Sequence, residues 1–376
     1  MASKEIMGKR KILSFQPFSL FNNGGGPRIL RRLVEGREDE VVFFSLVWKV
    51  PKSTAPYQQI SYMLLPPHRS WLRSFVRTFV TYLRDRVMRQ FNIRRIQARV
   101  AREKFDILHV LDHNSYSDIL TEQMKQRNIP IWASFHDHFD TTGSNRGITE
   151  SLWKNASKRM VISEEMGRYY GELFGKQDYT IVTDGLKPSE VSPAKTTMDP
   201  KNFTIYFGGL VHLDYYEIFE AFCKALDMLQ KQEGAKIKLI LRGTQRLSFL
   251  NGSDLDVDYR PFSIDSEVLR LEMDASDILY LPIKFNDADF YKYSFSTKLV
   301  GYLGACGNIF YHGPADAAAA QFLERHNCGV ISDTLEPSKI IVDMKKATGN
   351  FSYSENAKKV AREEFQLKIM QDRFFA

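Results

Sequence analysis

The chain has 376 residues, 43% hydrophobic and 26% charged, which suits two globular domains and argues against disorder. The formal net charge is +7, but residues 69–104 alone contribute +9, so the protein is not basic throughout. No apolar run reaches the roughly 20 residues of a membrane-spanning helix, and residues 1–11 are too polar and basic for a secretion signal. Cys223, Cys306 and Cys328 have neither disulfide-framework nor zinc-ligand spacing, so we expect a cytoplasmic protein.

Short, nearly continuous apolar runs alternate with helical stretches in the first half of the chain. We expect strands at residues 11–15, 41–47, 105–110, 129–136, 160–163 and 179–183. Such runs are typical of strands covered on both faces. Their alternation with helices predicts parallel βαβ units, and His109 within the third run is expected to face the core.

A glycine-rich turn, residues 22–26, follows the first expected strand and opens a helix from about Arg28. Glycines allow backbone N–H groups to approach an anion, and the next helix presents the positive end of its dipole. Gly25 and Gly26 are therefore candidates for contact with a phosphate group. A flexible turn between a strand and a helix is the alternative interpretation.

The basic segment, residues 69–104, holds ten Arg and one Lys against two acidic residues. If it were one continuous helix, Arg73, Arg77 and Arg84 would share a stripe beside an aromatic-rich apolar band. This composition is typical of an interfacial helix on an anionic membrane, so these three arginines are interpreted as a membrane or acceptor surface. The alternative is a solvated helix face. Nucleic acid is disfavoured because no recognition module accompanies the arginines.

The run Phe135-His136-Asp137-His138 ends a strand of the first half. Ligands of open α/β sheets bind at the carboxyl ends of the strands, so polar residues there are candidate site residues. His and Asp can serve as a general base toward a hydroxyl, which makes His136 and Asp137 the catalytic candidates. A hydrogen-bonded pair at a strand end is the structural alternative, and a metal site is disfavoured.

Residues 185–201 contain three prolines and few apolar residues, and they are expected to link a first domain, residues 1–184, to a second, residues 202–353. In the second domain we expect strands at 203–209, 237–241, 257–262, 278–283, 308–311 and 329–331, with a helix at 215–232. The polar, helical segment 354–376 is expected to pack back on the first domain.

The segment Ser296-Thr297-Lys298 begins an expected helix that ends near Gly307. Ser294 or Ser296 can cap this helix, and free N–H groups, a hydroxyl and an ammonium then converge in its first turn, which suits a phosphate group. Gly208 and Gly209 follow the opening strand of the second domain, and Arg242 ends its next strand. The alternative is an ordinary capped helix with an exposed lysine.

Residues 293–310 resemble the signature helix of glycosyltransferases with the B-type fold, especially family-4-like enzymes. Ser296-Thr297-Lys298-Leu299 and residues 302–307 follow that signature. Other segments resemble the family's motifs in the same order along the chain: residues 105–110, 132–137, 206–211 and 275–282. Tyr293 and Gly301 stand where the family often has glutamates, and Gly209 stands where it has a diphosphate-binding Arg.

The resemblance implies two Rossmann-like domains that face each other across a cleft. It also implies transfer of a sugar from a nucleotide diphosphate to a hydroxyl of a glycan or lipid-linked acceptor, as in bacterial envelope polysaccharide synthesis. The donor would contact Gly25, Gly26, Gly208 and Gly209, together with Arg242, Ser296, Thr297 and Lys298. No metal or other cofactor is implied. Two alternatives are a nucleotide-sugar epimerase of the same fold and a non-catalytic binding module.

Overall fold

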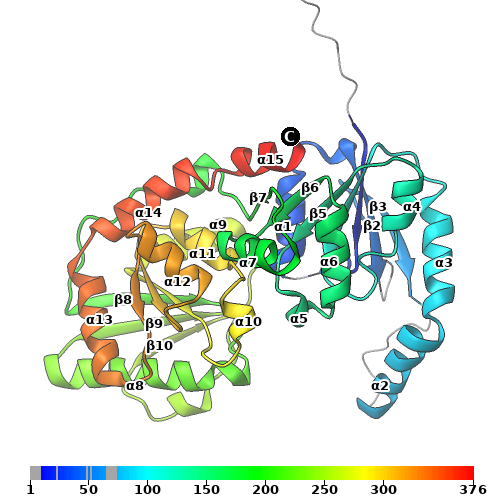
Figure 1. Cartoon of the computed structure of the whole chain (residues 1–376). Coiled ribbons are helices and arrows are strands. Elements are labelled where there is room, and N and C mark those ends of the chain that lie inside the picture. Colours follow the sequence, from blue (N-terminus) through cyan, green and yellow to red (C-terminus); the bar gives the residue numbers. More distant parts are fainter. Residues whose placement is uncertain (1–9, 23, 48–49, 51–52, 65–73) are drawn as a thin grey trace, which may run out of the picture. The chain divides into compact units, whose positions relative to one another are not determined.

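The computed structural model describes residues 10–22, 24–47, 50, 53–64 and 74–376. The chain divides into two compact units, residues 1–183 with 373–376 and residues 184–372. Each unit consists of a parallel sheet with helices on its faces, as Figure 1 shows. Among the described residues, no helix is both long and apolar enough to cross a bilayer.

The first unit contains a seven-stranded parallel sheet in the order β3-β2-β1-β4-β5-β6-β7. Its strands are β1 (Ile12–Gln16), β2 (Val41–Val47), β3 (Gln58–Met63), β4 (Ile107–Asp112), β5 (Ile131–Phe135), β6 (Lys158–Val161) and β7 (Thr180–Ile181). All side chains of β1, β4 and β5 are buried, as the continuous apolar runs predict. The predicted strands omit β3, an edge strand whose residues are only partly buried and whose apolar pattern is weak.

The helices of the first unit follow the strands in βα alternation. They are α1 (Gly25–Leu33), η1 (Glu38–Glu40), α2 (Ser74–Tyr82), η2 (Leu83–Val87), α3 (Arg89–Val100), α4 (Thr121–Gln126), α5 (Phe139–Thr142), α6 (Arg146–Asn155) and α7 (Glu164–Phe174). Helix α2 projects from the rest of this unit, and its main packing partner is η2, the segment that follows it (Figure 1).

The second unit contains a six-stranded parallel sheet in the order β10-β9-β8-β11-β12-β13. Its strands are β8 (Asn202–Gly208), β9 (Lys236–Arg242), β10 (Asp256–Arg260), β11 (Ile278–Pro282), β12 (Asn308–His312) and β13 (Val330–Ser332). Its core includes a stacked pair, Phe222 and Tyr280, with ring centroids 3.8 Å apart. The expected α/β class, with two Rossmann-like domains, is confirmed by these two parallel sheets.

The helices of the second unit include the long α8 (Tyr216–Glu233), which packs against α13 (Pro337–Gly349). The others are η3 (Pro188–Glu190), η4 (Leu213–Tyr215), η5 (Ser248–Leu250), α9 (Ser266–Ala275), α10 (Ala288–Tyr291), α11 (Thr297–Gly304), α12 (Ala318–Arg325), α14 (Ser352–Glu363) and α15 (Leu367–Phe375).

The tail of the chain differs from the expectation that residues 354–376 pack on the first domain. Helix α14 packs on α11 and β12, and the buried Lys358 ammonium donates to the carbonyls of Leu303 and Ala305. This ammonium satisfies carbonyl groups at the end of α11 that lack partners within the helix. Only residues 373–376 belong to the first unit, where Phe374 contacts the rings of His109 and Trp132. Residues 185–201, expected to be a linker, are part of the second unit.

The basic segment is not one continuous helix. Residues 69–73 are outside the described residues, and the helix from Ser74 changes at Leu83 into a π-helical turn that ends before a bend at Met88. The Met88 N–H donates to the Leu83 carbonyl at 2.8 Å, an i→i+5 hydrogen bond. Because this turn changes the angular register, residues before and after it do not form the single stripe that the sequence predicts.

Candidate functional site

The carboxyl edge of the first sheet brings the glycine turn and the His136 turn together. Helix α1 begins at Gly25, directly after Gly24, which has a φ of 148°. At Gly26 an added Cβ would lie 3.5 Å from His136 Nδ1 and 3.4 Å from the ring of Phe18. Gly26 and His136, candidates on segments far apart in the sequence, are therefore neighbours.

His136 is buried, with 6% of its surface exposed, and its Nδ1 has no hydrogen-bond partner among the described residues. Burial and, to a smaller extent, the nearby His113 together lower the pKa of His136 to about 3. The imidazole is therefore neutral at pH 7. Such a group can donate or accept a hydrogen bond, but it is a weak acceptor for a full proton. Asp137 lies beside it and is partly exposed.

Asp112, at the end of β4, anchors the loop that follows the His136 turn. Its carboxylate accepts hydrogen bonds from Ser144 Oγ at 2.6 Å and Thr149 Oγ1 at 2.5 Å. Burial raises the pKa of Asp112 to about 6, although these hydrogen bonds oppose the rise. By contrast, His109 lies inside the sheet between Ser14 Oγ and Ser134 Oγ, both at 2.8 Å, so its expected place in the core is confirmed.

The second unit places Lys298 in the first turn of α11, as the sequence predicts. Ser296 is the N-cap, and its Oγ accepts a hydrogen bond from the Lys298 N–H at 3.2 Å. The helix is held by its buried face, including Leu299 and Tyr302, whose hydroxyl donates to the Tyr280 carbonyl. Thr297, the first helical residue, is partly buried at the same end.

The Lys298 ammonium has no carboxylate partner among the described residues. Its Nζ lies 4.1 Å from the centroid of the Phe207 ring and 3.4 Å from the position of a Cβ added to Gly209. Burial lowers the pKa of Lys298 to about 8, so most of this group is charged at pH 7. A partly buried cation without a counter-charge is stabilised when an anion binds beside it.

Gly208 and Gly209 form the turn that Lys298 faces. Gly209 has a φ of 133°, which favours glycine, and its N–H donates to the Arg242 carbonyl at 2.8 Å. Its own carbonyl accepts from Thr244 Oγ1 at 2.7 Å. Lys298, Gly208 and Gly209 are thus brought together at the carboxyl edge of β8.

Arg242 is placed differently from the sequence-based assignment. Its guanidinium forms a bidentate ion pair with Glu272 on α9 and donates to the Pro261 carbonyl, and only 11% of its side chain is exposed. Arg260 shares the same carboxylate at 2.8 Å. Arg242 therefore braces α9 and the turn after β10, and its donors are already used. Glu272 lies on α9, 30 residues later in the chain, so the sequence around Arg242 could not predict this ion pair.

An exposed aromatic residue at this edge was missed by sequence reasoning. Phe262 follows β10, is 67% exposed, and lies 3.5 Å from the position of a Cβ added to Gly243. A large exposed ring beside a glycine can stack on a planar ligand. Its position two residues after the end of β10 is the feature of the sequence that could have indicated it.

A cavity of about 240 Å³ occupies the carboxyl edge of the first sheet, and we call it the edge cavity. Arg84 and Asp85 line it together with Asn114, Tyr116 and the apolar residues Pro17, Leu46 and Leu64. Sequence reasoning assigned Arg84 to a membrane-facing stripe. In the structure it pairs with Asp85, and only 13% of its side chain is exposed. Of the other two assigned arginines, Arg73 and the side chain of Arg77 lie outside the described residues.

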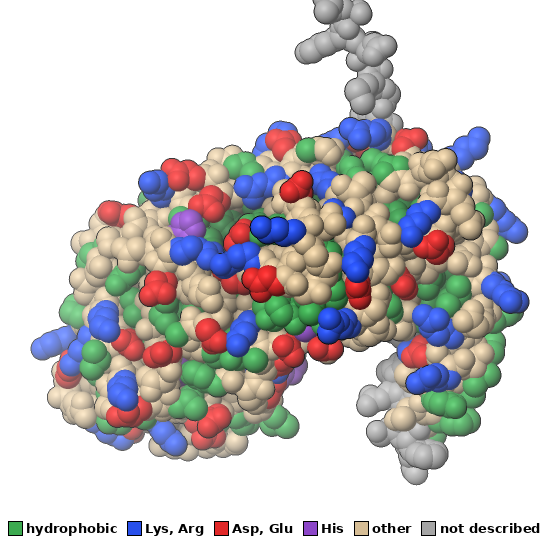
Figure 2. Space-filling view, in the orientation of Figure 1, with side chains coloured by type: hydrophobic (Ala, Val, Ile, Leu, Met, Phe, Trp, Pro, Cys, Tyr) green, Lys and Arg blue, Asp and Glu red, His purple; other side chains and the backbone are tan. Residues whose placement is uncertain are grey.

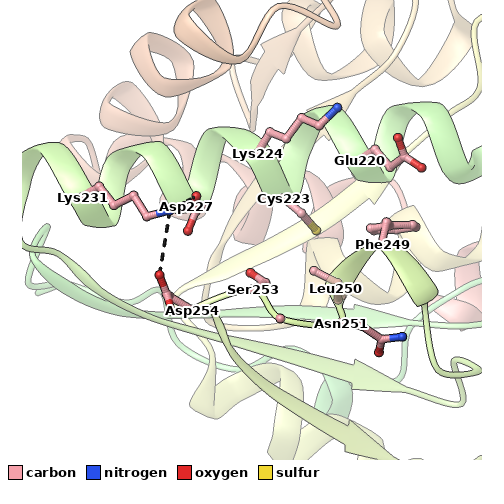
Figure 3. A pocket seen from close by; sticks show the side chains of 11 residues that line it. Glu220, Cys223, Lys224, Asp227, Lys231, Phe249, Leu250, Asn251, Ser253 and Asp254 are labelled. Carbon is pink, nitrogen blue, oxygen red and sulfur yellow. Dashed lines mark hydrogen bonds and ion pairs between the residues drawn. The ribbon is translucent and has the colours of Figure 1, made fainter.

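A second cavity, of about 260 Å³, lies in the second unit between α8 and residues 249–254 (Figure 3). Lys231 pairs with Asp227 on the same helix at 2.7 Å and reaches across the cavity to Asp254 at 3.8 Å. This loop precedes β10, so the cavity lies at the amino edge of the sheet, away from the usual ligand edge. Asp258, on the strand that follows this loop, pairs with Arg260 at 2.9 Å.

Residues 25–189 match the sequence model of Glycosyltransferase Family 4. No protein among the curated ones matches the chain. Among solved structures, Anabaena HepE in complex with UDP and glucose is 13% identical, with a TM-score of 0.67 over 97% of this chain and 98% of that one. WaaG, a glycosyltransferase of lipopolysaccharide biosynthesis, is 13% identical, with a TM-score of 0.60 over 96% and 98%. An E. coli structure bound with UDP-2-fluoro glucose is 12% identical, with a TM-score of 0.64 over 97% and 98%.

Proposed function

We propose that this chain, a family-4-like glycosyltransferase with the B-type fold, transfers a sugar from a nucleotide diphosphate to a hydroxyl of a glycan or lipid-linked acceptor. The observation that carries the proposal is the partly buried Lys298 ammonium, which has no carboxylate partner among the described residues and faces Gly209. It lies at the N-terminus of α11, where free N–H groups also favour an anion.

In this proposal the second unit binds the donor. Ser296, Thr297 and Lys298 contact the diphosphate, and the Gly208–Gly209 turn lets backbone approach it. As the glycosidic bond breaks, negative charge grows on the leaving diphosphate, and Lys298 with the α11 dipole stabilises it. In this proposal Lys298 and the α11 dipole stabilise the charge that a divalent metal ion stabilises in other enzymes. Transfer should therefore continue in excess EDTA. Phe262 is placed to stack on the nucleobase.

The first unit supplies His136 and the acceptor surface. Because burial keeps the imidazole neutral, His136 serves as a hydrogen-bonding group for a sugar hydroxyl. Asp137 is then the candidate proton acceptor for the attacking hydroxyl. Gly25 and Gly26 leave room for the donor sugar beside His136, because a Cβ added at Gly26 would lie 3.5 Å from its Nδ1.

The segment from α2 to α3 supports a second part of the proposal, attachment to an anionic membrane surface. Phe79, Tyr82 and Val87 are each more than half exposed on this segment. Exposed Arg86 and Arg94 accompany them, and Figure 2 shows hydrophobic and basic side chains next to each other over the projecting part. Apolar residues with nearby cations suit a lipid interface, where a lipid-linked acceptor of bacterial envelope polysaccharide synthesis would be found.

The test uses the purified full chain and a panel of nucleotide sugars. A donor that binds only the folded protein should raise its melting temperature. With that donor and a set of glycan and lipid-linked acceptors, release of the nucleoside diphosphate should depend on the acceptor. Conversion of the donor sugar without acceptor would instead identify an epimerase. Stabilisation without any turnover would indicate a binding module, and no stabilisation by any nucleotide sugar would contradict the proposal.

A further inference from the structure

The edge cavity contains a charged pair that a regular α-helix would not form. Adjacent residues of an α-helix point about 100° apart, so i,i+1 side chains do not face each other. Here Arg84 Nε donates to Asp85 Oδ1 at 2.6 Å, and Arg84 Nη2 donates to Asp85 Oδ2. The pair lies in the π-helical turn Leu83–Val87, and such turns often mark functional sites.

The pair and its surroundings define what the edge cavity can bind. The guanidinium balances the charge of the carboxylate, so the pair as a whole does not attract an anion. A phosphate placed against Asp85 would be repelled by its carboxylate. Each oxygen of Asp85 retains a lone pair that can accept a ligand hydroxyl. Leu46 and Leu64, each 3% exposed, provide an apolar wall. An apolar wall beside fixed polar atoms suits a neutral ring that carries hydroxyl groups.

The size of the edge cavity limits that ligand. Its volume of about 240 Å³ lies below the roughly 300–1,000 Å³ of typical small-molecule pockets. It therefore suits one sugar ring rather than an oligosaccharide.

The edge cavity adjoins the His136 region through two turns. Pro17 lines the cavity, and the ring of the next residue, Phe18, lies 3.4 Å from the position of a Cβ added to Gly26. Asn114 also lines the cavity and follows His113, whose ring packs edge-to-face against Phe18 with centroids 4.9 Å apart. A sugar in the cavity would thus lie close to the proposed reacting groups.

We propose that Arg84 and Asp85 form a specificity-determining subsite that binds hydroxyl groups on a neutral terminal sugar of the acceptor. This inference rests on the proposed function, because it assigns the acceptor class to the first unit. The π-helical turn orients both side chains into the cavity. The acceptor would then be recognised through one uncharged, hydroxyl-rich ring and not through a phosphate.

The experiment uses the full chain with UDP and a panel of neutral methyl hexopyranosides, followed by saturation-transfer NMR. At least one hexoside should bind, and Asp85→Asn should weaken that binding about tenfold or more, as expected when a hydrogen bond to a charged group is lost. Glu122→Gln, at a carboxylate with 76% exposure on α4, is the matched control and should bind normally. Arg84→Lys keeps the charge but loses the bidentate geometry, and it should give an intermediate loss.

The outcomes separate this inference from the proposed function. Stabilisation by nucleotide sugars should be the same for Asp85→Asn and the natural chain, which also shows that the variant is folded. If the donor stabilises the protein but no hexoside binds, or hexosides bind both Asp85→Asn and Arg84→Lys normally, the subsite is refuted. Stronger binding of hexose phosphates than of neutral hexosides would refute it as well. Absence of stabilisation by every nucleotide sugar would instead contradict the proposed function.

Discussion

The two units have a similar arrangement at the carboxyl edges of their sheets, but the charge there differs. In each, a glycine adjoins a titratable group: Gly26 lies beside the buried His136, and Gly209 lies beside the partly buried Lys298. Burial lowers both pKa values, to about 3 for His136 and about 8 for Lys298. At pH 7 the histidine is therefore neutral and the lysine remains mostly charged. Desolvation lowers the pKa of both groups, but from different ordinary values. It therefore leaves a neutral hydrogen-bonding site in the first unit and a cationic site for an anion in the second.

The largest expected effect is a loss of turnover, and it arises from His136 at the carboxyl edge of the first sheet. His136→Ala should lower turnover about 100-fold or more, because it removes a positioned hydrogen-bonding group, while donor affinity changes little. Initial rates and donor titrations on the same preparation would check this. His326→Ala, at a partly exposed histidine that faces Glu364, is the control. Normal turnover in His136→Ala would remove the proposed role of the first edge.

The next effect falls on donor affinity. Lys298→Met should weaken donor binding by about 1.5–3 kcal/mol, because it removes a charge-assisted hydrogen bond to phosphate. Calorimetric titration with the stabilising nucleotide sugar would measure it. Lys292→Met is the control, since this side chain is 41% exposed and pairs with Asp316. Equal affinity in Lys298→Met and the natural chain would contradict the assignment.

Lys298 also has a pH signature. Its folded-state pKa of about 8 lies below the ordinary 10.5, so the folded state disfavours the charged form. This cost is present below pH 8 and fades as pH rises toward 10.5. Ligand-free Lys298→Met should therefore melt no lower than the natural chain at pH 7, and the natural chain should lose donor affinity above pH 8. A lower melting temperature for the variant at pH 7 would show that the ammonium has a stabilising partner.

A smaller effect is expected from filling the space at the first edge. Gly26→Ala places a methyl group 3.5 Å from His136 Nδ1 and 3.4 Å from Phe18, where substrate is proposed to lie. Turnover should fall several-fold without unfolding, as steady-state rates and circular dichroism would show. Gly171→Ala in α7 meets nothing within 4 Å and should instead stabilise the fold by about 0.5–1 kcal/mol. If Gly26→Ala left turnover unchanged, as Gly171→Ala should, substrate would not occupy the space beside Gly26.

The smallest effect per residue concerns the membrane surface. Each basic residue near an anionic bilayer contributes about 1 kcal/mol, so Arg86→Glu with Arg94→Glu should reduce binding to anionic vesicles. Co-sedimentation at low and high salt would measure this, and the attraction should weaken as salt rises. A double charge reversal at Lys339 and Lys368, exposed lysines of the second unit, is the control. Equal binding to neutral and anionic vesicles would exclude an electrostatic attachment.

Most strands could be predicted from the sequence because parallel strands buried on both faces leave continuous apolar runs. The run at residues 41–47 coincides with β2, and the expected core position of His109 holds as well. The N-cap of α11 was also predictable, since a capping serine is a local signal. Strand β3 was missed because a partly exposed edge strand lacks that apolar run.

The candidate site was predictable only where its chemistry is local. Gly26 lies beside His136, and Gly209 lies beside Lys298, because of the order of the strands in each sheet. The local sequence around any one of these residues does not reveal its neighbour. The ion pair of Arg242 with Glu272 could not be predicted from the strand motif, because Glu272 lies on another element. The basic segment was misread because an i→i+5 turn has no clear sequence signal, and this turn directs Arg84 toward Asp85 and the edge cavity.

The end strands of the two sheets also bear on self-association. Strand β10 carries Asp256, Asp258 and Arg260 at alternate positions, so a foreign strand that paired there would have to desolvate charges. The end strands β7 and β13 have only two and three residues, whereas the end strand β3 has six and no charged residue among Gln58–Met63. Concentration-dependent aggregation of the purified protein should therefore begin at β3, and a lysine introduced on that strand should suppress it.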